Sequence, residues 1–448
     1  MTTQQSRPID AITRRRLLQV GLTTALSVPA LAGCAGFDTS GAAAGEGTAT
    51  FLSTQFAPVE ERQRYESVLK RNLTGVPVAY NPVDPGVFAS TLRSQSEAKA
   101  VKISLVGGLH GDLAPVADAL DPVDTLLGDL ATSGIPRDIL SLVNFGGEQP
   151  KYVPWMQATY IVAVHKSALE WLPSGVDVQN LTYDGYLAWA QAAKAATGKP
   201  VFGFPAGPKG LHHRFYQGFL LPSFTGGQIT TFRSDEAIGA WEYMAELWDA
   251  MVPGSTNFDF MQEPLQRGEV LVAWDHVARL VGAPADRPDE WLMVPAPRGK
   301  YGLGYLLVVA GVALPTGGTE RELAEQAIRA LSKPATQLDT LKNNAFFPVV
   351  RADLPDDLQG AISLEAAAVA AQQVAKDTLL ALPPVGLGAK DGEVSQIFKN
   401  CFQQICLEAQ PVRRVLDDQA KQLNAILSEL KVPCWAPDPV DSGICEVK

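Results

Sequence analysis

Histidine is the side chain that most often takes part in catalysis or binds a metal. The chain has five histidines: His110, His165, His212, His213 and His276. No two of them lie four residues apart, the spacing that places two imidazoles on one face of a helix around a metal. The motifs H-E-x-x-H, G-x-x-x-x-G-K-[ST] and G-x-S-x-G are also missing from the sequence. We therefore expect no metal, no cofactor and no reaction of this protein's own.

The sequence does not exclude one class of enzyme, the glycoside hydrolases. Two carboxylates that cleave a glycosidic bond need only lie close together in space, so their spacing in the chain carries no signature. A secreted, membrane-anchored glycoside hydrolase is therefore the alternative from a different functional class.

An apolar strand that ends in three groups able to hold a polar ligand is the strongest candidate for a binding site. The run from Val270 to Trp274 is followed by Asp275 and His276. The carboxylate and the imidazole form directed hydrogen bonds, and the indole offers a flat apolar face. The other interpretation is a core tryptophan beside a surface acid.

Four cysteines lie within the last fifty residues, at Cys401, Cys406, Cys434 and Cys445. An even number of cysteines outside the cytoplasm predicts two disulfides, whose connectivity the sequence leaves open. A metal site is not expected, because no C-x-x-C is present. We expect the bonds to fasten the tail, from residue 433 onward, to the preceding helices.

The N-terminus has the layout of an export signal. The order TRRRLL, which begins at Thr13, resembles a twin-arginine signal, and LAGC, which ends at Cys34, resembles the site cleaved before a lipid-modified cysteine. The apolar run from Leu17 to Leu31 is too short and too polar to span a bilayer stably. We predict a signal peptide over residues 1–33, a palmitate-type lipid anchor on Cys34 and a flexible tether over residues 34–47.

The rest of the chain has the composition of a soluble globular protein, with 46% hydrophobic and 19% charged residues. The formal net charge of −11 disfavours nucleic acid as a partner. The chain is too long for one compact core, so two lobes are expected, in a protein that is a monomer.

Strands and helices alternate from residue 48 onward, the pattern of a parallel sheet covered by helices on both faces. Two long apolar runs, 152–166 and 305–314, are interpreted as strands that pass from one lobe to the other. The predicted first lobe comprises residues 48–153 and 306–375. The predicted second lobe comprises residues 154–305 and 376–448, with the C-terminal helices and the cysteine-rich tail.

Three stretches carry a resemblance to a known family. They are YVPWMQATYIVAVHK from Tyr152, RGEVLVAWDH from Arg267 and GLGYLLVVAGVALP from Gly302. In their order and spacing behind a lipoprotein signal, the chain resembles the extracellular solute-binding proteins of carbohydrate-type, maltose-like ABC importers. The segment Val164-His165-Lys166 departs from the family's Tyr-Asn-Lys, and the four-cysteine tail is not general to the family.

The resemblance implies an α/β fold of the type II periplasmic-binding-protein kind, in which two lobes close on a ligand in the cleft between them. It implies a protein that captures a mono- to oligosaccharide or a related polyol and delivers it to the transmembrane permease of an ABC importer. The expected location is the outer face of the cytoplasmic membrane. Arg214 keeps a glycerophosphodiester or an acidic sugar open as the ligand.

Candidate ligand-binding residues follow from strand ends and from the matching segments. They are Gln55, Phe56, His110, Asp112, Trp155, Gln157, Tyr216, Trp274, Asp275, His276, Gly304 and Tyr305. For Trp155 the other interpretation is packed core, and for Asp112 it is a helix N-cap. At Gly304 the missing side chain would let backbone N–H groups approach a ligand.

Overall fold

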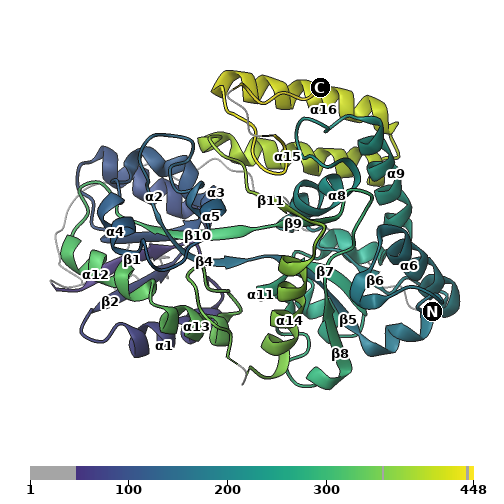
Figure 1. Cartoon of the computed structure of the whole chain (residues 1–448), viewed down its shortest axis with the longest axis horizontal. Coiled ribbons are helices and arrows are strands. Elements are labelled where there is room, and N and C mark those ends of the chain that lie inside the picture. The colour runs from purple at the N-terminus through teal and green to yellow at the C-terminus, as the bar shows by residue number, and fades with distance from the viewer. Residues whose placement is uncertain (1–46, 356–357, 440–442) are drawn as a thin grey trace, which may run out of the picture. The chain divides into compact units, whose positions relative to one another are not determined.

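The computed structural model describes residues 47–355, 358–439 and 443–448, which form one compact unit (Figure 1). The predicted signal peptide, the lipid-anchored Cys34 and all but the last residue of the predicted tether lie outside the described residues. Within the described ranges, no helix combines the length and the apolar character that crossing a membrane requires.

The first lobe is built on a mixed sheet with the strand order β2-β1-β3-β10-β4. Strand β1 (Ala49–Ser53) is buried along its whole length and pairs in parallel with β2 (Val78–Pro82) and β3 (Leu105–Leu109). Strand β10 (Val308–Ala313) runs antiparallel between β3 and β4 (Val153–Ala158). The parallel part of this sheet confirms the predicted alternation of strands and helices.

The second lobe contains a sheet with the order β6-β7-β5-β8. Its strands are β5 (Tyr160–His165), β6 (Phe202–Gly203), β7 (Val272–His276) and β8 (Trp291–Val294). A separate parallel pair joins β9 (Leu303–Leu306) to β11 (Thr378–Ala381). Both long apolar runs cross between lobes as predicted, since β4 continues into β5 at Thr159 and β9 continues into β10 at Leu307.

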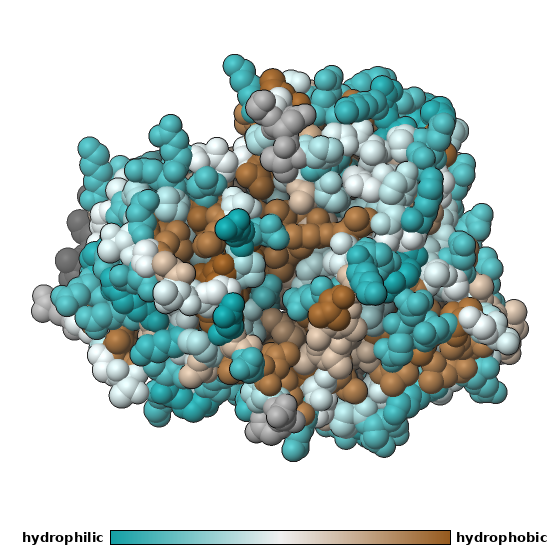
Figure 2. Space-filling model, viewed as in Figure 1, coloured by the Kyte–Doolittle hydropathy of each residue, from teal (hydrophilic) through white to brown (hydrophobic). Residues whose placement is uncertain are grey.

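One segment of the second lobe also reaches the first lobe, and we call it the third connection. It leaves β11 at Leu382 and runs to the short helix η7 (Gly388–Lys390), which contacts η1 (Ala114–Ala119) of the first lobe. Figure 2 shows apolar side chains on this face gathered over the strands that connect the lobes, with hydrophilic side chains around them.

Helices cover the sheets of both lobes. The first lobe has α1 (Val59–Asn72), α2 (Pro85–Glu97), α3 (His110–Leu113), α4 (Asp124–Asp129), α5 (Arg137–Leu140), α12 (Arg321–Leu331) and α13 (Pro334–Asn344). The second lobe has α6 (Tyr183–Thr197), α7 (His213–Phe215), α8 (Leu221–Thr225), α9 (Asp235–Asp249), α10 (Gln262–Gln266), α11 (Val277–Leu280), α14 (Gly360–Val374), α15 (Asp391–Phe402) and α16 (Val412–Leu430). Helix α1 carries acidic residues in its first turn and basic residues in its last, which suits the helix dipole.

Helix α14 lies on the other side of the predicted lobe boundary at residue 375. It packs against β5, β8 and β9 of the second lobe. The buried amide of Gln372 explains this position, because its Nε2 donates to the Tyr160 carbonyl (3.1 Å) and its Oε1 accepts the Ala296 N–H (2.7 Å). The first lobe therefore ends before α14.

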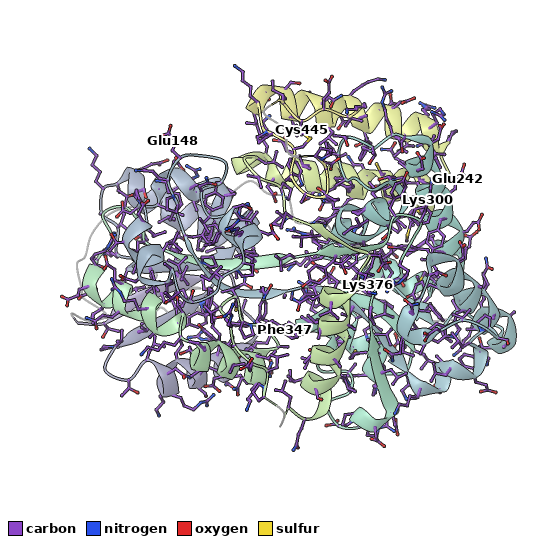
Figure 3. All side chains as sticks on the ribbon, in the orientation of Figure 1. Glu148, Glu242, Lys300, Phe347, Lys376 and Cys445 are labelled. Carbon is purple, nitrogen blue, oxygen red and sulfur yellow. A yellow bond between two sulfur atoms is a disulfide. The ribbon has the colours of Figure 1, made fainter. Side chains whose placement is uncertain are left out.

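The cysteine-rich tail differs from the prediction. Cys434 and Cys445 form a disulfide inside the tail, whereas Cys401 and Cys406 are free thiols on α15 and the turn after it. Figure 3 shows Cys445 beside the C-terminal helices. The predicted bond from the tail to these helices was wrong, because the tail closes on itself and is held by hydrogen bonds.

Candidate functional site

The site is built where strands of the two sheets end. Strand β1 leads into Thr54 and Gln55, and β3 leads directly into α3, which contains Asp112. In the second lobe, β7 ends at His276 and leads into α11, which carries Arg279. The carboxyl ends of strands are where α/β sheets place their ligands, so these segments form the candidate site.

Asp112 is fixed by the first lobe. Its Oδ2 accepts the Thr54 hydroxyl at 2.6 Å and the Leu109 backbone N–H at 3.1 Å. The Gln55 amide in turn donates to Thr54 Oγ1 at 2.9 Å. Burial raises the pKa of Asp112, and these hydrogen bonds and the charge of Arg214 act in the opposite direction. Thus Asp112 caps the turn at Leu109 and still lies in the field of a cation from the other lobe.

Arg214, from α7 of the second lobe, lies near two carboxylates. Its charge lowers the pKa of Asp112 and of Asp391, while burial raises both pKa values. Gly111 lies at the centre, because a Cβ built there would be 3.1 Å from Asp391 Oδ2 and 3.8 Å from Arg214 Nη2. Among the described residues, none of the salt bridges includes Arg214, although its charge acts on both carboxylates.

A second cation of the second lobe faces the first lobe. The Arg279 guanidinium lies 4.1 Å from the centre of the Phe260 ring, and its buried Nη1 has no hydrogen-bond partner within the described ranges. Burial raises the pKa of Glu61, on α1 of the first lobe, and the charges of Arg64 and Arg279 lower it. The Phe260 side chain is 45% exposed. The pair Phe260 and Arg279 therefore offers a flat apolar surface next to an unsatisfied donor.

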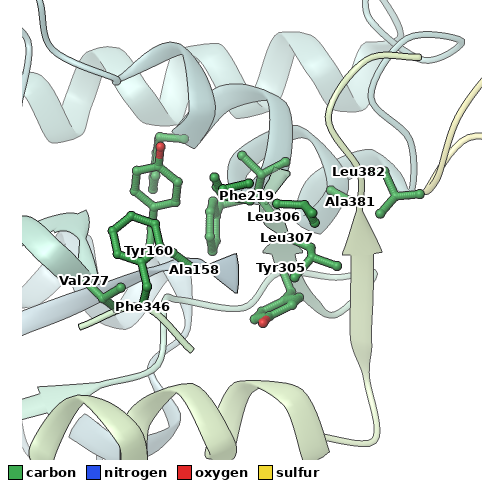
Figure 4. Packing of buried hydrophobic residues seen from close by; sticks show 14 of the residues in the cluster. Ala158, Tyr160, Phe219, Val277, Tyr305, Leu306, Leu307, Phe346, Ala381 and Leu382 are labelled. Atoms are coloured by element: carbon green, nitrogen blue, oxygen red, sulfur yellow. The ribbon is translucent and has the colours of Figure 1, made fainter. Parts of the chain in front are cut away.

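His276 is a neutral donor in this arrangement. Burial, together with the charges of Arg279 and Arg214, lowers the pKa of its imidazole to about 3. Its Nδ1 accepts the Ala278 N–H at 3.2 Å, which leaves the proton on Nε2. The ring lies 5.6 Å from that of Phe346, which Figure 4 shows beside Tyr160 and Val277. His276 thus lies where the second lobe meets a segment that follows α13 of the first.

The contacts of Asp275 and Trp274 indicate structural roles for both residues. Asp275 is fully buried, and its two oxygens accept the Met261 N–H (2.9 Å) and the His276 N–H (2.7 Å). Burial raises the pKa of Asp275 to about 6. Trp274 is 1% exposed and stacks on Tyr160 at 4.5 Å. Asp275 therefore anchors the loop that presents Phe260, and the Trp274 indole has almost no free surface for a ligand.

Most other predicted side chains are also engaged within the protein. Phe56 and Trp155 belong to one aromatic cluster of the first lobe, and Tyr216 packs 4.6 Å from Trp241 in the second. The Gln157 amide donates to the Pro348 carbonyl at 2.6 Å, and its backbone pairs with that of Phe347, which is labelled in Figure 3. The four side chains are therefore explained by aromatic packing and by hydrogen bonds between segments of the protein.

The remaining predicted residues lie beside the connections. His110 bonds to the Tyr152 hydroxyl (3.1 Å) and, through Nε2, to the Pro384 carbonyl (3.0 Å), and burial lowers its pKa to about 4. The Gly304 N–H donates to Ser223 Oγ at 2.9 Å, and a Cβ at Gly304 would lie 2.6 Å from the Phe219 carbonyl. The Tyr305 hydroxyl accepts the Gln373 amide at 3.0 Å. The glycine is therefore explained by close backbone packing.

Sequence reasoning left Phe260, Arg279 and Asp391 out of the candidate set. Phe260 stands between Asp259 and Met261 before a short helix, and only its exposure distinguishes it from a core phenylalanine. Asp391 is distant in sequence from every other site residue. The described residues contain no group of His, Cys, Asp and Glu that could hold a metal ion.

Comparison with known proteins identifies the architecture. Residues 58–338 match the family described as bacterial extracellular solute-binding protein. The structure is similar to maltose-bound MalE3 of T. maritima (TM-score 0.69, 19% identity, covering 85% of this chain and 100% of that one). It is also similar to the GacH receptor of Streptomyces glaucescens (0.68, 15%, 86% and 99%). A third similar structure is UgpB from Mycobacterium tuberculosis in complex with glycerophosphocholine (0.66, 17%, 86% and 99%). The likeness shows a shared two-lobed fold. No curated protein sequence matches the chain.

Proposed function

The chain belongs to the bacterial extracellular solute-binding protein family, and we propose that it captures a carbohydrate or a related polyol between its lobes. The ligand then passes unchanged to the transmembrane permease of an ABC importer. In this proposal the protein works as a monomer outside the cytoplasmic membrane, to which a lipid on Cys34 anchors it.

The observation that carries the proposal is the meeting of Asp112, Arg214 and Asp391 around Gly111. Each hydroxyl of a polyol donates one hydrogen bond and accepts others. Carboxylates accept such bonds and a guanidinium donates them, and both kinds are stronger than bonds between neutral groups. The site thus presents both partners that a run of hydroxyl groups needs, from segments of both lobes.

Phe260 and His276 support the same ligand class. A pyranose ring has an apolar C–H face that suits an exposed phenyl ring. The neutral His276 imidazole adds a directed donor at the end of β7. A micromolar affinity, about −8 kcal/mol, would allow both capture and release.

A phosphodiester of glycerol is the second candidate ligand. The observation that favours it is the pair of cations Arg214 and Arg279, the second with a buried Nη1 that has no partner among the described residues. The acids Asp112, Asp391 and Glu61 lie in the field of these cations, and their charges oppose an anionic ligand. This balance is why a neutral polyol is preferred.

Titration of the soluble protein, from residue 47 onward, tests the proposal. The ligands are maltose, tagatose, acarbose and glycerophosphocholine. Tryptophan fluorescence and calorimetry measure their binding, and mass spectrometry identifies the ligand that is recovered. We expect saturable binding of a sugar that is recovered intact. Replacement of Asp112 by Asn should weaken that binding about tenfold or more, because the amide offers one acceptor instead of two oxygens.

The matched control is Asp118→Asn, which changes an exposed carboxylate of the same lobe. It should bind like the unaltered protein. Release of a shorter sugar would show a glycoside hydrolase, and tight binding of glycerophosphocholine alone would show the second candidate ligand. Either result would overturn the preferred function.

A further inference from the structure

A buried carboxylate is one of the groups that fasten the C-terminal tail to the second lobe. Asp438 is 2% exposed, and its two oxygens accept the backbone N–H groups of Gln228, Ile229 and Thr230, each at 2.8 Å. The Trp435 indole adds a bond from its Nε1 to Gln228 Oε1 at 2.6 Å. A buried charge with this many donors is firmly held, because moving it would leave both the charge and the donors unsatisfied.

The same stretch of tail also holds the third connection, the segment that follows β11. The Leu382 N–H donates to the Ala436 carbonyl at 3.0 Å. Val432 covers Gly386, where an added Cβ would lie only 2.8 Å from Val432 Cγ1. Residues 432–438 therefore contact the connection at its first residue and again at Gly386. We call residues 432–438 the tail brace.

The third connection leads into the candidate site. It begins after β11 and continues through η7 directly into Asp391, the first residue of α15. On its other side, the Pro384 carbonyl accepts a hydrogen bond from His110 of the first lobe. The connection is thus held from both lobes, and the position of Asp391 beside Arg214 depends on where the connection lies.

We propose that the tail brace positions Asp391 for ligand binding by tying the third connection to the second lobe. Asp438 and Trp435 act as positioning residues through the connection, and neither touches the site. The disulfide between Cys434 and Cys445 closes the loop that contains both residues, which limits the conformations open to the free tail. The contacts rest on the fold alone, whereas the effect on binding rests on the proposed function.

Hydrogen exchange of the soluble protein, from residue 47 onward, tests the contacts between the tail brace and the third connection. It needs no ligand. In Asp438→Asn, peptides that cover residues 382–391 should exchange about tenfold faster, because the amide cannot accept all of these N–H bonds and the brace loosens. Peptides of β1 should be unchanged. The matched control, Asp418→Asn, alters an exposed carboxylate of α16 and should leave residues 382–391 unchanged.

Unchanged exchange at residues 382–391, with faster exchange in the tail itself, would overturn the proposal. If Asp438→Asn fails to fold, Trp435→Phe replaces it, since this variant keeps a buried aromatic ring, although a smaller one, and removes the indole N–H that bonds to Gln228. Thermal unfolding of each variant separates local loosening from global destabilisation.

A titration with the sugar that saturates the unaltered protein tests the consequence for the site. Asp438→Asn and Asp391→Asn should each weaken binding, and the double variant should bind no more weakly than Asp391→Asn alone, because both act through one carboxylate. Additive losses would contradict the positioning role. If the unaltered protein binds none of the sugars tested, the proposed ligand class fails, and the exchange experiment still decides on the brace.

Discussion

At the scale of single residues, the candidate site contains a charged side chain whose hydrogen-bonding partners are incomplete. Arg279 has a buried Nη1 without a partner among the described residues and an exposed ring, Phe260, beneath its guanidinium. A buried donor left unpaired costs about 1–3 kcal/mol. A ligand oxygen that accepts from Nη1 would remove this cost, which makes Arg279 a source of affinity.

Removing either member of this pair should weaken ligand binding and spare the fold. Phe260→Ala should lower the affinity about tenfold, because it removes the flat surface, and Arg279→Gln should lower it by a similar factor. Calorimetry with the sugar that saturates the unaltered protein measures both effects. Arg267→Gln is the matched control, because Arg267 pairs with exposed acids on the same lobe. Unchanged affinity in Phe260→Ala and Arg279→Gln would exclude this pair from the site.

Sequence patterns pointed to some of the candidate site residues and missed others. His276 ends a buried strand and Asp112 comes shortly after another, and strand ends can be read from the alternation of apolar and polar runs. Trp274 shows the limit, because its partner Tyr160 belongs to a strand more than a hundred residues earlier. Whether an aromatic ring faces a ligand or the core depends on such distant partners, and so do the roles of Phe260 and Asp391.

At the scale of elements, helix α14 contains an unusual buried acid. Both oxygens of Glu365 are buried without a hydrogen-bond partner among the described residues. Burial raises the pKa of this carboxyl well above the usual 4.5. Between pH 4.5 and the folded pKa, the folded protein therefore holds a proton there that the unfolded chain releases.

Glu365 makes the free energy of unfolding depend on pH. Because the folded pKa is the higher one, the ionisation of Glu365 costs no stability below about pH 4. Its contribution to the free energy of unfolding falls as the pH rises above 4.5 toward the folded pKa. Glu365→Gln should therefore raise the free energy of unfolding at pH 7 by about 1–3 kcal/mol, and the gain should shrink at pH 4.

Urea unfolding at both pH values measures this effect. Glu148→Gln is the matched control, because Glu148 is an exposed acid of the first lobe (Figure 3) and should show no gain at either pH. An equal gain for Glu365→Gln at pH 4 and pH 7 would rule out the ionisation as its cause.

Helices and strands were easier to predict from the sequence than the elements they pack against. The β-rich runs and the charges at the ends of α1 are local signals, and they predicted the first lobe's sheet and helix correctly. Helix α14 is rich in alanine, and nothing in its own pattern selects a sheet to pack against. Its lobe is set by contacts such as those of Gln372, which the sequence pattern does not show.

At the scale of the whole molecule, we expect the strand crossings to act as the hinge between the lobes. Thr159 and Leu307 join the sheets, and the Thr159 hydroxyl donates to the Leu306 carbonyl at 2.8 Å, which ties the two crossing strands together. Closure of two lobes about a few such residues is the common motion of binding proteins. The crossings were predictable, because an apolar run too long for one strand indicates two strands in succession.

Ligand binding should make the molecule more compact. Small-angle scattering of the soluble protein should show a smaller radius of gyration after a saturating sugar is added, because the lobes close on it. A solute that does not bind in the titration is the control and should leave the radius unchanged. An unchanged radius with the sugar bound would place the site away from the region between the lobes.

Strand β10 sits between β3 and β4, although it is made long after both. As the chain leaves the ribosome, β4 has no neighbour to pair with until residue 308 has been synthesised. An unpaired edge of this kind invites association with other chains. The nascent protein is therefore exposed to aggregation until most of its length is complete, and chaperone protection would matter most in that interval.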